Sequence, residues 1–406
     1  GYNAGNDITT GTLNTFIGGL AGDAINTGAE NVALGYNALT ADVKGNASIA
    51  IGSKALQAQS FSGATDAYNT AVGHNAGKAV TTGVNNTLIG GLAGDEITEG
   101  TRNTAVGTSV MTKTTTGVDN TAIGGIDAAA NATLGTNTTG TNNVAVGGGA
   151  LFGNTTASNN TAVGYRALKT NTTASGNVAV GGLALDANTT GSANTAVGYN
   201  ALTDNIAGVN NTAVGQSALG NVLNDGNTAI GLSAGAGISS GQYNTSLGLV
   251  SMTAATYVGS YNSSIGYNAN PSAADSSGQF TLGDTNISNL RCNDQSISAL
   301  SDSRDKTDVI DSPYGLDFIN TVRPVQFKWD TRDGNVTDGS TRIGFLAQEL
   351  LTATDGNNAV LDLVLEENPN KLEAKYGNLL PVLVKALQEL SAKNDALEAR
   401  IKTLEG

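Results

Sequence analysis

The stretch NTAVGYNAL, residues 194–202, contains the pattern that decides the fold of most of this chain. Small residues at 196 and 198 alternate with the β-branched Thr195 and Val197, which is the two-residue period of a short β-strand. Gly198 follows at the point where the backbone must bend or approach another segment closely. The rest of the unit is rich in Thr, Asn, Ser and Gly, which favour turns and exposed loops. We therefore expect one short strand and one long turn per unit.

The same core, Asn-Thr-Ala-Val/Ile-Gly, recurs along the first two thirds of the chain, most often every 17 residues. Steps of 23 residues from 46 to 69 and from 120 to 143 indicate loop insertions of six residues. A period of 17 does not match the common helical solenoids. The copies begin at Asn14, Asn31, Asn69, Asn86, Asn103, Asn120, Asn143, Asn160, Asn177, Asn194, Asn211, Asn227, Asn244 and Asn262, with a looser copy at Asn46.

A single unit has too few large apolar residues to form a core. We expect the units to stack and to bury their Val, Ile and Leu against their neighbours, as in a solenoid. Fifteen rungs at a strand spacing of about 4.8 Å would make a rod roughly 70 Å long. The inward residues would be mostly Ala, Val, Ile and Gly, a thin core for a lone chain. Several chains are therefore expected to associate around an axis.

Composition divides the chain near residue 270 and excludes several classes of protein. All five prolines lie at or beyond position 271, and residues 1–270 hold 7 basic and 13 acidic residues against 13 and 21 in the remainder. The net charge of −14 argues against a nucleic-acid partner, and no apolar run is long enough for membrane insertion. With one cysteine (Cys292) and one histidine (His74), the sequence offers no metal site, and no cofactor is expected.

Four motifs follow one another in the C-terminal part: SDSRDK at 301–306, YGLDFINTVRPVQFKW at 314–329, GFLAQEL at 344–350 and YGNLLPVLVKALQEL at 376–390. In this order they resemble the intramolecular chaperone domain found at the end of phage tail fibres and endosialidase tailspikes, over roughly 300–406. The repeats before them are similar to the heads of trimeric adhesins and to the β-rolls of phage tail fibres.

The chaperone resemblance implies a single-turnover, self-cleaving serine endopeptidase that first brings three chains into register. It places the scissile bond between Leu300 and Ser301, with Ser301 as the nucleophile and Lys306 as its base. Lysine can take this role when burial favours its neutral form. Asp302 and Arg304 match the motif and are expected to orient the reacting groups. The alternative for this segment is a solvated charged turn.

Residues 380–405 have the heptad pattern of a trimeric coiled coil. Near-identical repeats can pair out of register at little cost, so alignment of the chains must come from outside the shaft. Asn394 at an a position lowers stability and specifies alignment. The alternative is an amphipathic helix packed within one chain. The expected trimerisation residues are Leu380, Leu383, Leu387, Leu390, Asn394, Leu397, Ile401 and Leu404.

These patterns predict a mainly β, homotrimeric β-roll or β-solenoid fibre. Its parts are a shaft at 1–270, a β connector at 271–300 and an α+β chaperone domain at 301–406. We expect a phage tail-fibre or appendage protein of the virion, with its chaperone domain assembled in the host cytoplasm. Its mature rod would bind a host-surface glycan or protein.

The chain opens with the back half of a unit, GYNAG, so an upstream domain is expected to attach the rod to the virion. Two other classes of protein compete with this interpretation. A bacterial trimeric surface adhesin would keep the C-terminal domain as a permanent, non-cleaving cap. A glycan-degrading tailspike would need a carboxylate pair, whereas the acids of the repeats are scattered through loops.

Overall fold

The computed structural model describes residues 1–287, 290, 301–328, 339–370 and 372–406. It divides into two compact units, Gly1–Gly283 and Asp284–Gly406. The first is a β-solenoid and the second is an α+β unit that ends in a long helix. The predicted fold class is therefore confirmed.

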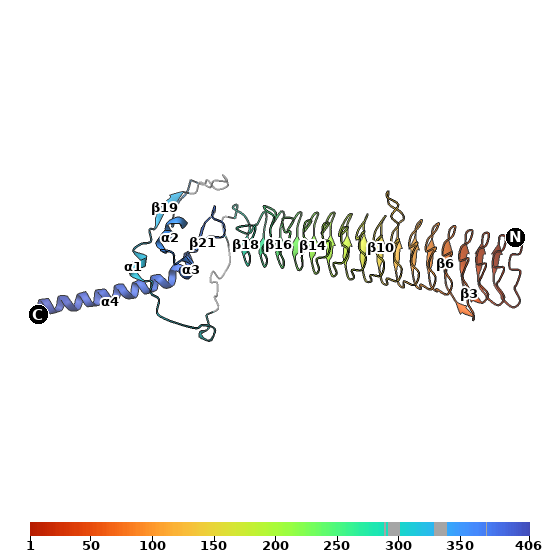
Figure 1. The fold of residues 1–406 in the computed structure, drawn as a ribbon, viewed down its shortest axis with the longest axis horizontal. Coiled ribbons are helices and arrows are strands. Elements are labelled where there is room, and N and C mark those ends of the chain that lie inside the picture. Colours follow the sequence, from red (N-terminus) through yellow and green to blue (C-terminus); the bar gives the residue numbers. More distant parts are fainter. Residues whose placement is uncertain (288–289, 291–300, 329–338, 371) are drawn as a thin grey trace. The chain divides into compact units, whose positions relative to one another are not determined.

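Each turn of the solenoid contributes one short strand to a single parallel sheet of 16 strands (Figure 1). Neighbouring strands pair in the register of the repeat, so that Thr195 lies opposite Thr212 on one side and Val178 on the other. The strands are β1 (Thr15–Ile17), β2 (Val32–Leu34), β4 (Ile49–Ile51), β6 (Thr70–Val72), β7 (Thr87–Ile89), β8 (Thr104–Val106), β9 (Thr121–Ile123), β10 (Val144–Val146), β11 (Thr161–Val163), β12 (Val178–Val180), β13 (Thr195–Val197), β14 (Thr212–Val214), β15 (Thr228–Ile230), β16 (Thr245–Leu247), β17 (Ser263–Ile265) and β18 (Phe280–Leu282).

The interior of the solenoid differs from the expected one. The middle residue of a strand points inward, so Ala196 is fully buried while its neighbours Thr195 and Val197 lie on the outer face and are only half-buried. In most turns the large buried side chain lies on the wall that faces the strand, where Leu202 is fully buried with a φ of 54°. Strand β7 reverses this arrangement, with Leu88 buried in the strand and Gly94 at the position equivalent to Leu202. The expectation that strand Val and Ile fill the core is wrong, because they occupy the outward positions of the strands, and most turns combine a small inward strand residue with a large one on the facing wall.

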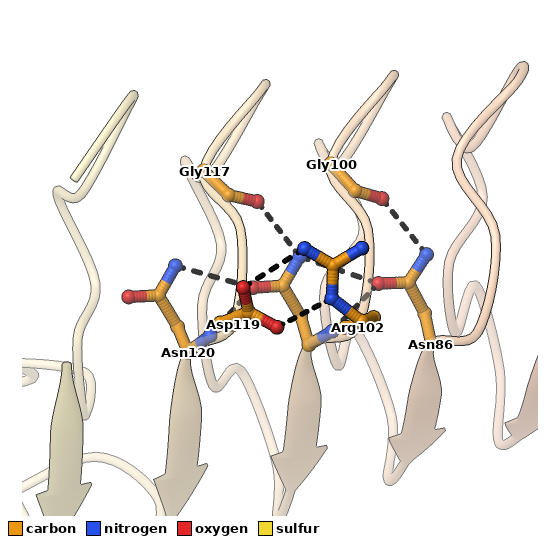
Figure 2. Close-up of polar contacts among 7 residues, drawn as sticks. Asn86, Gly100, Arg102, Gly117, Asp119 and Asn120 are labelled. Atoms are coloured by element: carbon orange, nitrogen blue, oxygen red, sulfur yellow. Dashed lines mark hydrogen bonds and ion pairs between the residues drawn. The ribbon is translucent and has the colours of Figure 1, made fainter. Parts of the chain in front are cut away.

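A ladder of buried asparagines runs along the shaft beside the strands. Each of these asparagine side chains accepts a hydrogen bond from the backbone of the next ladder residue and donates one to a backbone carbonyl farther along the chain, usually 14 residues ahead. Asn103 Oδ1 accepts from Asn120 N at 3.1 Å, and Asn103 Nδ2 donates to Gly117 O at 2.8 Å. Figure 2 shows Asn86 and Asn120, the ladder residues on either side of Asn103. Asn86 donates to Gly100 O at 2.9 Å in the same way. The asparagine that recurs at the first position of the repeat is thus explained by polar groups that must be satisfied once they are buried.

Two details of the repeat are corrected by the strand pairing. Ile49 lies opposite Val32 and Thr70, so Ser48 rather than Asn46 takes the ladder position of that turn. The step to the next ladder residue is therefore 21 residues. Asn46 instead belongs to a two-stranded pair formed by β3 (Gly45–Asn46) and β5 (Thr65–Asp66).

The sheet also continues past residue 270. Strand β18 lies within the stretch predicted to be a connector, and the ladder reaches it because Gln279 N donates to Asn262 Oδ1 at 3.0 Å. Gln279 stands where the motif has asparagine, so the sequence pattern did not predict this turn. The rest of the connector includes residues 288–289 and 291–300, which lie outside the described residues, as does Cys292.

The second unit contains short elements packed against the start of a long helix. Its core consists of Leu350, Leu361, Leu363, Val364, Leu379 and Val382. No helix within the described ranges has the length and apolar character needed to cross a membrane. The elements are η1 (Ser303–Asp305), α1 (Leu316–Ile319), the antiparallel β19 (Val325–Lys328) and β20 (Thr341–Gly344), α2 (Ala347–Ala353), α3 (Asn358–Leu361), the antiparallel β21 (Val364–Leu365) and β22 (Glu373–Ala374), η2 (Tyr376–Asn378) and α4 (Leu379–Glu405).

Candidate self-cleavage and assembly site

A single helical turn brings the predicted serine and lysine together. Asp302 caps η1 by accepting a hydrogen bond from Arg304 N at 2.9 Å, and Asp305 N donates to Asp302 O. The turn reverses the chain, so residues five apart in sequence meet. Lys306 Nζ donates a hydrogen bond of 2.7 Å to Ser301 Oγ. The pair has the geometry expected of a nucleophile and its base.

Asp302 and Arg304 form an ion pair that stabilises this turn. Arg304 Nη2 lies 2.6 Å from Asp302 Oδ2, and Arg304 Nε donates to the other carboxylate oxygen at 3.0 Å. The hydrogen bonds from the Arg304 side chain and backbone lower the pKa of the Asp302 carboxyl group. Neither residue contacts the serine or the lysine through a described hydrogen bond, so their place is in the turn that positions the pair.

The whole motif is exposed in the single chain. Residues 301–313 are all exposed to solvent, and the next residue, Tyr314, is the first to join the core of the second unit. Leu300, the predicted residue before the scissile bond, lies outside the described residues, and so does Trp329 at the end of the second motif. The structure therefore describes the C-terminal side of the proposed scissile bond, which begins at Ser301, but not the N-terminal side.

Helix α4 presents two different faces. Its inner face carries Leu379, Val382 and Ala386, which are at most 5% exposed and pack within the chain. The predicted a and d positions lie on another face, where the seven apolar side chains are 42–81% exposed. The chain's own core therefore does not use the heptad stripe. These apolar residues are Leu380, Leu383, Leu387, Leu390, Leu397, Ile401 and Leu404.

Glu389 ties α4 to the segment that follows the motif. Its Oε2 accepts a hydrogen bond of 2.7 Å from Leu316 N, at the start of α1. A Cβ on Gly315 would lie 2.6 Å from the other carboxylate oxygen, so a larger residue there would displace the Glu389 side chain. Sequence reasoning missed this contact, because Glu389 stands 73 residues from its partner and occupies an outer heptad position that also suits an ordinary solvated glutamate.

Comparison with known families identifies the segment that contains this pair. Residues 301–361 match the peptidase S74 family, described as chaperone of endosialidase. The chain carries a chaperone of endosialidase domain. No curated protein and no solved structure is detectably similar to the chain. The predicted resemblance of the C-terminal part is confirmed, and in this chain the domain is preceded by the solenoid.

The family match indicates the general function of the chaperone domain. It begins at Ser301 and ends at Leu361 in α3, so α4 lies beyond the matched residues. Domains of this family act in trimeric fibres, are typical of phage tail-fibre and endosialidase proteins, and imply self-cleaving activity.

Proposed function

We propose that this chain is a structural fibre protein of a phage tail or appendage, whose chaperone domain assembles three copies and then cleaves itself from the shaft at Leu300–Ser301. The observation that carries the proposal is the 2.7 Å hydrogen bond between Lys306 Nζ and Ser301 Oγ at the start of the matched domain. The mature rod would belong to the virion and bind a host-surface glycan or protein. The chaperone domain would assemble in the host cytoplasm.

The proposed cleavage is an acyl transfer followed by hydrolysis. The Ser301 hydroxyl gives its proton to the Lys306 amine and forms a C–O bond with the carbonyl carbon of Leu300, while the C–N bond to the Ser301 nitrogen breaks and this nitrogen takes up a proton. Water then hydrolyses the ester, which leaves a carboxylate on Leu300 and restores the serine hydroxyl. Each chain performs the reaction once, so the activity is a single turnover.

Exposure of the motif supports a link between assembly and cleavage. A lysine serves as a base when its surroundings favour the neutral amine, and removal from solvent is the usual way to achieve this. The single chain leaves Ser301 and Lys306 exposed. We therefore expect the reaction to begin when the other two chains cover the motif.

Two exposed apolar surfaces support the homotrimer. One is the heptad stripe of α4 and the other runs along the outer face of the solenoid sheet, where the third residue of successive strands is Val, Ile or Leu. Contiguous apolar surface of this length marks an association site. The most exposed members of the sheet stripe are Ile17, Leu34, Ile89, Ile123, Val180, Ile230, Leu247 and Leu282.

The test compares the chain with Ser301→Ala and Lys306→Met variants by intact mass and denaturing gels. The parent should yield pieces of 300 and 106 residues, and both variants should remain whole. Ser303→Ala is the matched control, because Ser303 is an exposed serine of the same motif and should cleave like the parent. A parent that stays whole while trimeric would instead support the permanent cap of a bacterial surface adhesin.

A further inference from the structure

Two exposed tyrosines stack on each other near the C-terminal end of the shaft. Tyr243 and Tyr261 occupy the position just before the ladder asparagine in neighbouring turns, with ring centroids 5.3 Å apart and an interplanar angle of 19°. They are 52% and 66% exposed, so the stack is not part of the solenoid core. Exposed aromatic rings held parallel by the backbone repeat form a rigid platform.

The turns on either side of the stack have glycine at the equivalent position. On the N-terminal side, a Cβ on Gly226 would lie 2.6 Å from the Tyr243 ring, so this ring rests on the glycine. On the C-terminal side, no described atom lies within 4 Å of where a Cβ on Gly278 would be. The stack therefore has a closed end over Gly226 and an open ring position over Gly278.

The turns around this open position are polar and carry no basic side chain. Gln242 and Ser260 precede the two tyrosines, and Ser260 N donates a hydrogen bond to Ser277 Oγ at 3.0 Å. Between Lys169 and Arg291 the sequence contains no Lys or Arg. An anionic ligand would have no basic side chain to pair with here. A neutral molecule with one apolar face and several hydroxyl groups could stack on the tyrosine ring and form hydrogen bonds with the polar side chains.

We infer that the outer face of Tyr261 binds a pyranose ring of a neutral glycan in the open position over Gly278. The electron-rich face of the ring attracts the C–H groups on the apolar face of a sugar, and the neighbouring serine and glutamine groups are suited to bind its hydroxyls. The inference rests on the proposed function, because it assigns a site and a ligand class to the host-surface binding of the mature rod. It goes beyond that proposal by naming the residues.

The experiment measures binding of maltohexaose, cellohexaose and chitohexaose to the parent by saturation-transfer NMR and isothermal titration calorimetry. At least one of these neutral oligosaccharides should bind saturably. Tyr261→Ala should weaken that binding by about tenfold, as truncation of a central aromatic contact does. Tyr199→Ala is the matched control, because Tyr199 is 53% exposed on the same shaft and should leave the affinity unchanged.

A second pair of variants tests the open position itself. Gly278→Asn fills it with a side chain that tolerates the local φ of 71°, and asparagine already occupies the same position before other ladder residues, at Asn85 and Asn210. This variant should lose binding. Gly176→Asn is its control, because Gly176 occupies the same position with a φ of 73° in a turn without a tyrosine stack, and it should bind like the parent.

Three results would overturn the inference. They are absence of saturable binding to all three oligosaccharides, equal affinities for Tyr261→Ala and the parent, and full protection of both tyrosines from hydroxyl-radical labelling in the assembled protein. Adsorption of the rod to host cells separates this failure from that of the proposed function. A Tyr261→Ala rod that adsorbs like the parent retains host binding at another site, whereas a parent rod that does not adsorb contradicts the proposed function.

Discussion

Asp127 is a buried carboxylate that holds an inserted loop on the solenoid. Its Oδ1 accepts hydrogen bonds from Ala129 N at 2.8 Å and from Asn131 N at 2.9 Å, and its Oδ2 accepts from Arg166 Nε at 2.5 Å. Burial alone would raise the pKa of Asp127. The hydrogen bonds from Asn131, Arg166 and Ala129 outweigh that effect and keep the pKa well below its usual range.

This balance predicts an acid-dependent stability. A carboxyl group with a lowered pKa in the folded state stabilises the fold above its unfolded-state pKa of about 3.9, and the contribution is lost as the pH falls further. The shaft should therefore lose stability on going from pH 6 to about pH 3, and Asp127→Asn should lose less of it over the same range. Thermal unfolding followed by circular dichroism measures both. Asp204→Asn, at an exposed carboxylate of the shaft, should behave like the parent, and equal acid losses for the parent and Asp127→Asn would contradict the argument.

Gly198 shows why each strand is followed by glycine. Its φ is 138°, and a Cβ at this position would lie closer than 3.0 Å to the carbonyl oxygen of Gly215 in the next turn. Gly198→Ala should lower the free energy of unfolding by about 3 kcal/mol, since it adds both backbone strain and a clash with backbone that cannot move aside. Urea denaturation of the shaft checks this value. Gly63→Ala has open space around its Cβ and is the control; similar midpoints for the two variants would exclude the clash as the reason for the glycine.

At the scale of single elements, α4 uses one face to pack within its own chain and leaves another face available for assembly with other chains. Leu387 lies on the exposed heptad stripe, whereas Ala386 beside it is buried against the chain's own domain. Leu387→Lys should therefore abolish the trimer while leaving the second unit folded, because a charged side chain would be buried at the seam between helices. Light scattering after size-exclusion chromatography measures the assembly state, and a gel of the same fractions measures cleavage.

The matched control for this element is Gln388→Lys. Gln388 is exposed and lies outside the a and d positions, so this variant should remain trimeric and cleave like the parent. A monomeric Leu387→Lys protein that still cuts itself completely would show that cleavage does not depend on assembly. A Leu387→Lys protein that remains trimeric would show that the interface between the chains does not include the heptad stripe of α4.

At the scale of the whole shaft, the solenoid is a sum of turns that contact only their neighbours. Deletion of residues 177–193 removes one turn and joins Gly176 to Asn194, so the strand, the ladder asparagine and the buried leucine all meet equivalent partners. This shortened chain should fold with nearly unchanged thermal stability. Deletion of 177–185 shifts the register by half a turn and should prevent folding of the shaft. Circular dichroism and solubility distinguish the two, and equal behaviour would contradict the nearest-neighbour account.

The sequence by itself determined the repeat, the stacking of its units and the chaperone motif, because these depend on local patterns. A strand at Thr195–Val197 and its partner one turn later follow directly from the 17-residue period. The motif at 301–306 could also be recognised from the sequence, because the two residues proposed to react lie within one turn of each other.

Only the tertiary structure decided which strand residues face inward, how far the sheet extends and how α4 divides its two faces. In a three-residue strand, alternation alone does not say which set is buried. The structure turns the middle residue inward, which is Ala196 rather than Val197, and it does the same in β7, where the middle residue is Leu88. Ser48 and Gln279 continue the ladder through backbone position rather than side-chain identity, and Glu389 meets Leu316 from 73 residues away. Such contacts depend on segments that are brought together by packing, so a local sequence pattern does not predict them.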